Sequence, residues 1–268
     1  MKKIKTYFVD AFTNQKFKGN PAAVCIVEND LDSSTMQSIA TEIGFSETAF
    51  IQQITGNTYN IRFFTPKTEI PLCGHATLAS SKIVFDTTLC DSITFINCNK
   101  VELFVEKVGH TIKMQFPVYD TAEIDVPQKM LVALGITELA NIRYNHDNKI
   151  ILIEINNALD LAHLKPNFRT LVDSYTGING VLVTALSDSA DFDFHYRYFW
   201  PWAGTDEDPV TGGVQTFLTK YWAIRLNKTQ FNAYQSSFRT GTMRTELLLD
   251  KVCILGEAVT VLEGHFMI

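Results

Sequence analysis

The 268-residue chain has no surplus of basic residues, no long apolar run and few cysteines. Its formal net charge of −6 argues against a nucleic-acid binder, because such proteins usually carry a basic face. A membrane-spanning helix needs roughly 20 apolar residues in succession, and no such run is present. The five cysteines are an odd number without the spacing of a disulfide framework or a zinc site. We therefore expect no nucleic-acid partner, no membrane span and no metal.

The chain also lacks a signal-like apolar segment and the common cofactor and nucleophile motifs. Asp10, Asn14 and Gln15 interrupt the apolar run that a signal peptide would need after the basic amino terminus, so a cytoplasmic protein with reduced thiols is expected. The chain also lacks the Gly-x-x-x-x-Gly-Lys phosphate loop, the Gly-x-Gly-x-x-Gly dinucleotide turn, His-Glu-x-x-His and Gly-x-Ser-x-Gly. Acid/base chemistry without a cofactor is the class of reaction that remains.

What the chain does have is apolar material arranged in short periodic runs. With 46% hydrophobic and 12% aromatic residues, it can fill the core of one large domain or two ordinary ones. Met36, Ile39, Ala40 and Ile43 recur at helical spacing before Gly44, which predicts a helix that ends there. Aromatic and β-branched runs predict strands on either side of it, among them residues 5–12, 22–27, 45–51 and 59–64.

Two glycine turns followed by apolar helices stand out, at Pro71–Ala79 and at Asp208–Gly213. The start of a helix presents unpaired N–H groups and the positive end of the helix dipole, which together suit a small anionic ligand. The helix after the first turn is apolar on most sides, so we expect the rest of its domain to enclose it.

The strands before these turns resemble each other, which indicates an internal duplication. Ile61–Pro66 is similar to Tyr196–Pro201, and each is followed by a short loop, a glycine turn and a helix. We expect two similar domains, residues 1–117 and 118–268, with a linker over residues 117–127 and the two helix starts facing each other across a cleft. The alternative is chance similarity between aromatic strands.

Glu47 is a candidate acid/base residue. It lies between Phe45 and Ala49 on the face of a strand that these residues would bury. Burial raises the pKa of a carboxyl group towards neutrality, which suits general acid/base catalysis. The alternative is an edge strand with a solvated face, and the residues alone favour it.

Asp208 is the second candidate carboxylate. Followed by Pro209, it also has the pattern of a helix N-cap with proline at the first helical position, which would be a purely structural role. Its neighbours Asp206 and Glu207 could exchange roles with it.

His75 and Cys73 belong to the first glycine turn. At a helix start the dipole disfavours a proton on His75, so a neutral imidazole that relays protons is expected; the alternative is a buried histidine with satisfied hydrogen bonds. Cys73 is either an activated thiolate or a small buried hydrophobe.

Five motifs together resemble the PhzF-type isomerases, the phenazine-biosynthesis F-like proteins. They lie in the same order as in that family, and with Tyr221-Trp222, Gln235–Ser237 and Gly256–Val259 the resemblance covers essentially the whole chain. The motifs are Val9–Thr13, Gly19–Val24, Ser46–Phe50, Leu72–Thr77 and Glu207–Gly212.

The resemblance implies an α/β (α+β) fold of the diaminopimelate-epimerase type. This fold has two pseudo-equivalent domains, each a curled, mostly antiparallel sheet around a central helix, with the active site in the cleft between them. It also implies a cofactor-independent isomerase of the racemase and epimerase class (EC 5), in a homodimer, acting on a small-molecule carboxylate in a biosynthetic process. Glu47 matches the family's acid/base glutamate, and His75 and Asp208 match its proton-handling partners. The residues that would bind the substrate are Cys73, Gly74, Gly212 and Gly213.

The chain departs from the family pattern at one turn. The family usually has Gly-Ser-Ala-His where this chain has Gly212-Gly213-Val214-Gln215, so a hydroxyl that would touch the substrate is missing. The departure puts the substrate in doubt rather than the fold. Two alternatives to the isomerase stay open: a racemase or epimerase in which Cys73 is the base, and a non-catalytic protein that binds a metabolite on the same scaffold.

Overall fold

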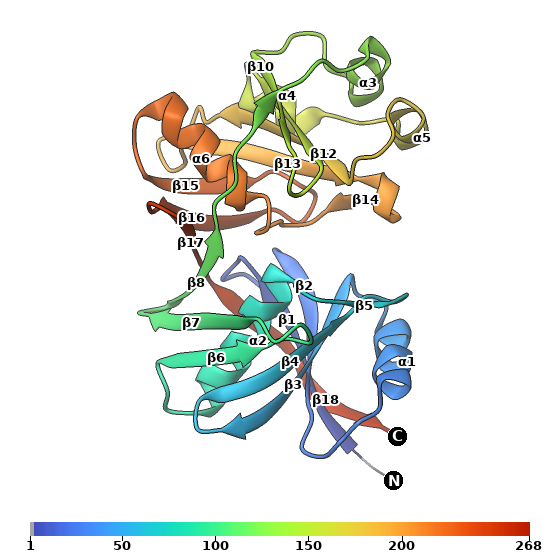
Figure 1. The fold of residues 1–268 in the computed structure, drawn as a ribbon, viewed down its shortest axis with the longest axis vertical. Coiled ribbons are helices and arrows are strands. Elements are labelled where there is room, and N and C mark those ends of the chain that lie inside the picture. The colour runs from blue at the N-terminus through green and yellow to red at the C-terminus, as the bar shows by residue number, and fades with distance from the viewer. Residues whose placement is uncertain (1–2) are drawn as a thin grey trace. The chain divides into compact units, whose positions relative to one another are not determined.

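The computed structural model describes residues 3–268, which form two compact units. Unit 1 holds the chain up to Gln115 together with Cys253–Ile268, and unit 2 is Phe116–Val252. Figure 1 shows the course of the chain through the two units. Within the described residues, no helix is both long enough and apolar enough to cross a membrane.

Unit 1 combines strands with two helices. Its elements in chain order are β1 (Lys3–Ala11), β2 (Asn20–Ile26), α1 (Ser33–Ile43), β3 (Glu47–Thr55), β4 (Thr58–Phe64), β5 (Glu69–Ile70), α2 (Gly74–Thr87), β6 (Ser92–Ile96), β7 (Glu102–Val108), β8 (Thr111–Pro117) and β18 (Ala258–Met267). Most neighbouring strands are antiparallel, whereas β2–β3 and β4–β6 are parallel pairs.

The two helices of unit 1 pack against opposite faces of its sheet (Figure 1). Successive side chains of a strand point to opposite faces. Phe50 on β3 packs with Met36 and Ile39 of α1, and the intervening positions face α2. The helix α2 is buried over most of its length, as its apolar sequence predicts.

Unit 2 repeats this mixture of strands and helices. Its elements are β9 (Ala122–Glu123), α3 (Gln128–Leu134), β10 (Asn141–Asn145), β11 (Ile150–Ile155), α4 (Ala158–His163), α5 (Phe168–Val172), β12 (Gly180–Leu186), β13 (Phe194–Trp200), the 3-10 turn η1 (Pro201–Ala203), β14 (Thr205–Asp208), α6 (Gln215–Leu226), β15 (Gln230–Gln235) and β16 (Gly241–Leu247). The strand β17 (Lys251–Gly256) begins in unit 2 and ends in unit 1, and the last two residues of β8 belong to unit 2. One apolar core joins β11 and β12 to α3, α4 and α5, and α6 buries Trp222 against the ring of Phe194.

The two units share one topology, as the similarity between Ile61–Pro66 and Tyr196–Pro201 predicts. In unit 1, β3 pairs parallel with β2 and antiparallel with β4, which is parallel to β6. In unit 2, β12 pairs parallel with β11 and antiparallel with β13, which is parallel to β15. A helix precedes the last strand of each series, α2 in unit 1 and α6 in unit 2.

The division of the chain differs from the expected one at its carboxyl end. Residues 253–268, expected in the second domain, belong to unit 1, because β18 pairs antiparallel with β1 along its whole length. The expected linker over residues 117–127 is also not a free connection. It contains β9, which pairs with β10 in unit 2.

Candidate active site

Glu47 is the first residue of β3 and is almost completely buried. It lies opposite Ala22 in the parallel pair of β2 and β3, so it is not on an edge strand. The residue is only 6% exposed, and desolvation of an isolated carboxylate at such a position would be costly. A charged partner is therefore required, and the sheet brings one close.

That partner is His75, the second residue of α2. Its Nε2 lies 3.1 Å from Oε2 of Glu47, and both side chains are more than nine-tenths buried. The contact is an ion pair when the imidazole carries its proton. The small exposed fraction that each residue keeps, 6% for Glu47 and 7% for His75, leaves the pair within reach of a bound molecule.

The pair holds its proton on the imidazole. Burial raises the pKa of Glu47, but the neighbouring His75 outweighs burial and the pKa of Glu47 is lowered. Burial likewise opposes a charge on His75, yet Cys73 and Glu47 beside the ring raise the pKa of His75 well above its ordinary value. The expectations of a raised pKa for Glu47 and of a neutral imidazole are both wrong, because each residue lies next to the other.

Asn20 contacts the other nitrogen of the ring. Its Nδ2 lies 3.2 Å from Nδ1 of His75, and Asn20 is completely buried at the start of β2. The two orientations of the amide match the two charge states of His75: Nδ2 donates to a neutral ring, whereas Oδ1 accepts from a protonated one. Gly19 makes this approach possible, because a Cβ at its φ of +65° would lie 2.2 Å from the carbonyl oxygen of Ala11.

Cys73 lies beside the pair but is not a thiolate. Its Sγ is 3.5 Å from Nδ1 of His75, and it precedes α2 without capping it through a side-chain hydrogen bond. Burial raises the pKa of the thiol despite the nearby imidazole, so the reading as a small buried hydrophobe fits better than an activated thiolate. The carboxylate of Glu47 is then the negative charge that keeps His75 protonated.

Glu47, Cys73 and His75 also form a possible set of metal ligands. One ligand atom from each lies within 4.8 Å of the others. A divalent cation would have to displace the proton of His75 and take over the carboxylate of Glu47, which would abolish the ion pair.

In unit 2 the acidic triplet divides into three distinct environments. Asp206 is exposed, Glu207 is bound to Arg197, and Asp208 is 7% exposed at the end of β14. The reading of Asp208 and Pro209 as a helix start is wrong, because α6 begins only at Gln215. A carboxylate oxygen of Asp208 instead accepts a hydrogen bond from the hydroxyl of Thr211.

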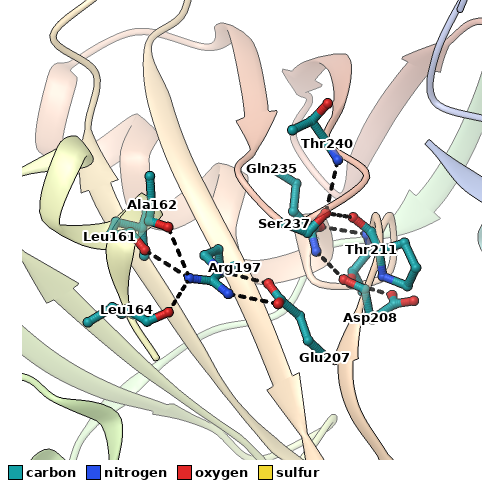
Figure 2. A network of polar contacts seen from close by, with 11 residues as sticks. Leu161, Ala162, Leu164, Arg197, Glu207, Asp208, Thr211, Gln235, Ser237 and Thr240 are labelled. Carbon is teal, nitrogen blue, oxygen red and sulfur yellow. Dashed lines mark hydrogen bonds and ion pairs between the residues drawn. The ribbon is translucent and has the colours of Figure 1, made fainter. Parts of the chain in front are cut away.

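Gln235 fixes the loop that carries Asp208 (Figure 2). Its Nε2 donates to the carbonyl of Asp208 at 2.6 Å, and its Oε1 accepts from the N–H of Thr211 at 2.7 Å. Ser237 donates to the carbonyl of Pro209 at 2.5 Å. Two side chains from the end of β15 and the residues after it thus hold both sides of the loop.

The second glycine turn leaves backbone donors open. Gln215 and Thr216 donate their N–H groups to the carbonyls of Gly212 and Gly213, the first bonds of α6. Within residues 3–268, no acceptor is bonded to the N–H groups of Gly212 and Gly213 themselves. A Cβ on Gly213 would meet no atom within 4 Å, so the missing serine side chain leaves open space rather than a changed backbone.

Comparison of the units shows that Glu47 has no counterpart in unit 2. The parallel pair of β2 and β3 in unit 1 corresponds to the parallel pair of β11 and β12 in unit 2. In this correspondence Glu47, the first residue of β3, matches Gly180, the first residue of β12. A Cβ on Gly180 would lie 2.6 Å from the ring of Tyr198, so this tyrosine fills the space. Burial, and then the nearby Asp208, raises the pKa of Tyr198.

The structure therefore groups the expected site residues by unit. Glu47, Cys73, Gly74 and His75 lie together in unit 1, and Asp208, Gly212 and Gly213 lie together in unit 2. Asn20 and Gln235 were not predicted as site residues, although both belong to motifs of the family resemblance, Gly19–Val24 and Gln235–Ser237. The signal for Asn20 was its place after Gly19, a glycine whose backbone conformation brings the amide to the ring.

Comparisons with known proteins agree on the family. The model of the phenazine biosynthesis-like proteins (PhzC-PhzF) matches residues 9–264. A relative from Halalkalibacterium halodurans described as an uncharacterised isomerase is 42% identical over 266 residues, which cover 98% of each chain. The crystal structure of a phenazine biosynthesis PhzF-family protein from Enterococcus faecalis has a TM-score of 0.93 and 34% identity, over 100% of both chains.

A more distant structure shows the fold alone. A protein from Pseudomonas aeruginosa described as a predicted epimerase has a TM-score of 0.74 at 17% identity, over 99% of both chains. The expected α+β fold of the epimerase type is confirmed by this likeness and by the two units with one topology.

Proposed function

Because the chain belongs to the phenazine biosynthesis-like (PhzC-PhzF) family, we propose that it is an isomerase that moves a proton between carbon atoms of a small carboxylated substrate, without a cofactor. The observation that carries this proposal is the buried ion pair of Glu47 and His75. A relative 42% identical is itself named an isomerase, which supports the same class of reaction.

Glu47 is the base in this proposal. Its lowered pKa keeps the carboxylate ionised near neutral pH, so it can accept a proton from a carbon atom of the substrate. His75 is protonated next to it and stabilises the carboxylate before the transfer. Once Glu47 carries the substrate proton, it can return that proton to a different carbon.

The carboxylate of the substrate would bind at a helix start. The N–H groups of Gly74 and His75 begin α2, which no side chain caps. An anion held there lies next to the Glu47–His75 pair, because His75 belongs to both features. The roles of Asp208, Gly212 and Gly213 in the same reaction stay predictions, as do the homodimer, the cytoplasmic location and the biosynthetic process.

Proton transfer at carbon can be followed directly. Candidate cyclic acids and amino acids are incubated in deuterated water, and label at carbon is measured by NMR. We expect Glu47→Gln to lower the labelling rate by about 100-fold or more, because it removes the base but keeps the shape of the side chain. Cys73→Ser is the matched control and should label at nearly the wild-type rate.

The result also separates the alternatives. Full labelling by Glu47→Gln would show that another group moves the proton, and loss of labelling in Cys73→Ser would favour the thiol as base. The raised pKa of Cys73 opposes that second outcome. Binding of carboxylates by the wild type without label in any of them would favour the non-catalytic binding protein.

A further inference from the structure

Each unit holds an arginine in the same structural setting. Arg62 on β4 contacts Glu69 of β5 through two bonds of 2.8 and 2.6 Å. Arg197 on β13 contacts Glu207 of β14 through two bonds of 2.7 Å. Each guanidinium also lies over the phenylalanine two residues further along its strand, at 5.1 and 4.9 Å. The two arginines therefore occupy equivalent positions.

In unit 2 the remaining nitrogen of the arginine is saturated by backbone carbonyls. Nη1 of Arg197 donates to the carbonyl oxygens of Leu161, Ala162 and Leu164, at 3.2, 3.4 and 2.8 Å (Figure 2). These carbonyls come from the end of α4 and the residue after it. The side chain is accordingly only 10% exposed.

In unit 1 the arginine makes fewer hydrogen bonds. Nη2 of Arg62 reaches the hydroxyl of Ser33 at 2.9 Å, but no acceptor within residues 3–268 is bonded to its Nη1. The side chain is 28% exposed. The Nη1 group therefore has acceptors at Arg197 in unit 2, whereas the Nη1 group of the equivalent Arg62 in unit 1 has none among the described residues.

A cavity of about 360 Å³ is lined by Arg62, and we call it the Arg62 pocket. Neither Glu47 nor His75 lines it. Its charged lining residues are Arg62, Lys100 and Asp30, and its apolar lining includes Phe50, Ile61 and Ile96.

We propose that the Arg62 pocket binds a small carboxylic acid with an apolar chain, free or as an amino acid, whose carboxylate takes the place that the α4 carbonyls occupy in unit 2. The carboxylate would accept from Nη1 of Arg62 and lie near the ammonium group of Lys100, which forms no ion pair within the described residues. The apolar chain would cover Phe50 and Ile61. Asp30 also lines the pocket, and its negative charge would limit the site to a ligand with one carboxylate.

The size of the cavity favours a small ligand over a protein segment. A volume of about 360 Å³ is at the lower end of the range for small-molecule sites. A helix end comparable to α4 would need a groove about 10 Å wide for its side chains. A molecule of the size of leucine fits the space better.

Binding can be measured by titration of the nitrogen-15-labelled full chain with leucine, 4-methylpentanoate and 4-methylpentanamide. We expect either acid to shift the backbone N–H signals of Gln52, Asn97 and Lys100. The uncharged 4-methylpentanamide should bind at least about tenfold more weakly than the acids. Arg62→Lys keeps a positive charge next to Glu69 but removes the unbonded Nη1 group. Lys100→Asn removes the ammonium group, and asparagine tolerates the positive φ of residue 100. Each variant should weaken binding about tenfold.

The matched control is Lys67→Asn, which removes an exposed charge outside the pocket and should leave binding unchanged. Equal binding of the acid and its amide would overturn the proposal, as would unchanged binding in Arg62→Lys and Lys100→Asn. Shifts confined to residues 74–77 would place the ligand at the start of α2 and would overturn it too. Failure of the proposed isomerase activity would leave all these outcomes unaffected, because the pocket does not include its residues.

Discussion

The ion pair of Glu47 and His75 links the stability of unit 1 to pH. The lowered pKa of Glu47 means that its stabilisation is present above its ordinary pKa of 4.5 and is lost as the pH falls through the folded value. The raised pKa of His75 means that its stabilisation is present below 6.5 and is lost as the pH rises through the folded value. The pair therefore contributes most between pH 4.5 and 6.5.

Glu47→Gln should show this window directly. We expect the variant to lose about 3 kcal/mol of unfolding free energy between pH 4.5 and 6.5, because His75 then lacks its counter-charge. The loss should shrink as the pH rises through the folded pKa of His75, because the wild-type imidazole then also loses its proton. Urea titrations of wild type and variant at a series of pH values give the difference, and a difference independent of pH would contradict the assigned charges.

At the scale of residues, the sequence singled out Glu47 and His75 but did not predict their charges. Glu47 and His75 are recognisable from their motifs, whereas their protonation depends on a contact between a strand and a helix that are far apart in the sequence. Burial alone predicts a raised pKa for Glu47, and the helix dipole alone predicts a neutral His75. The direct ion pair outweighs both effects, and no local pattern reveals it.

At the scale of elements, Gln235 determines the shape of the loop after β14. It is completely buried and bonds to Asp208 and Thr211 with both ends of its amide. The loop has no helix of its own before α6, so these two bonds replace the backbone bonds that a helix would provide.

Gln235→Leu should therefore destabilise the loop. We expect a loss of about 2 kcal/mol, because the N–H of Thr211 would lose its acceptor and the carbonyl of Asp208 would lose the amide that donates to it. Urea unfolding gives the loss, and hydrogen exchange at Thr211 should become faster.

The matched control is Gln230→Leu, at the exposed start of the same strand. Its effect should stay within about 0.5 kcal/mol. Equal effects of the two substitutions would show that the amide of Gln235 does not hold the loop.

Most elements are predictable from the sequence, and the exceptions have physical causes. Periodic apolar residues mark α1, the two glycine turns announce α2 and α6, and aromatic and β-branched runs mark several long strands. Asp208 and Pro209 have the local pattern of a helix start, but the backbone at Asp208 is committed to the pairing of β14 with β13. Pairing with a distant strand overrides a local capping signal.

At the scale of the whole molecule, the two units share a topology but not a chemistry. The equivalence of β3 and β12 places Glu47 and Gly180 at corresponding positions, so unit 1 alone carries the carboxylate. The duplication was predictable because aromatic strands before both glycine turns preserve it. The return of the chain to unit 1 was not predictable, because β18 pairs with β1, which lies at the opposite end of the sequence.

That return gives a test of the division between the units. Deletion of residues 257–268 removes β18, which pairs with all of β1 and packs against α2. We expect hydrogen exchange to become fast in β1 and α2, because β1 then exposes an unpaired edge, while β11 and β12 keep their protection. Deletion of the last two residues alone is the control and should change neither unit. If the longer deletion instead lowered protection in β11 and β12 and spared β1, the carboxyl-terminal strand would belong to unit 2, as the sequence alone suggests.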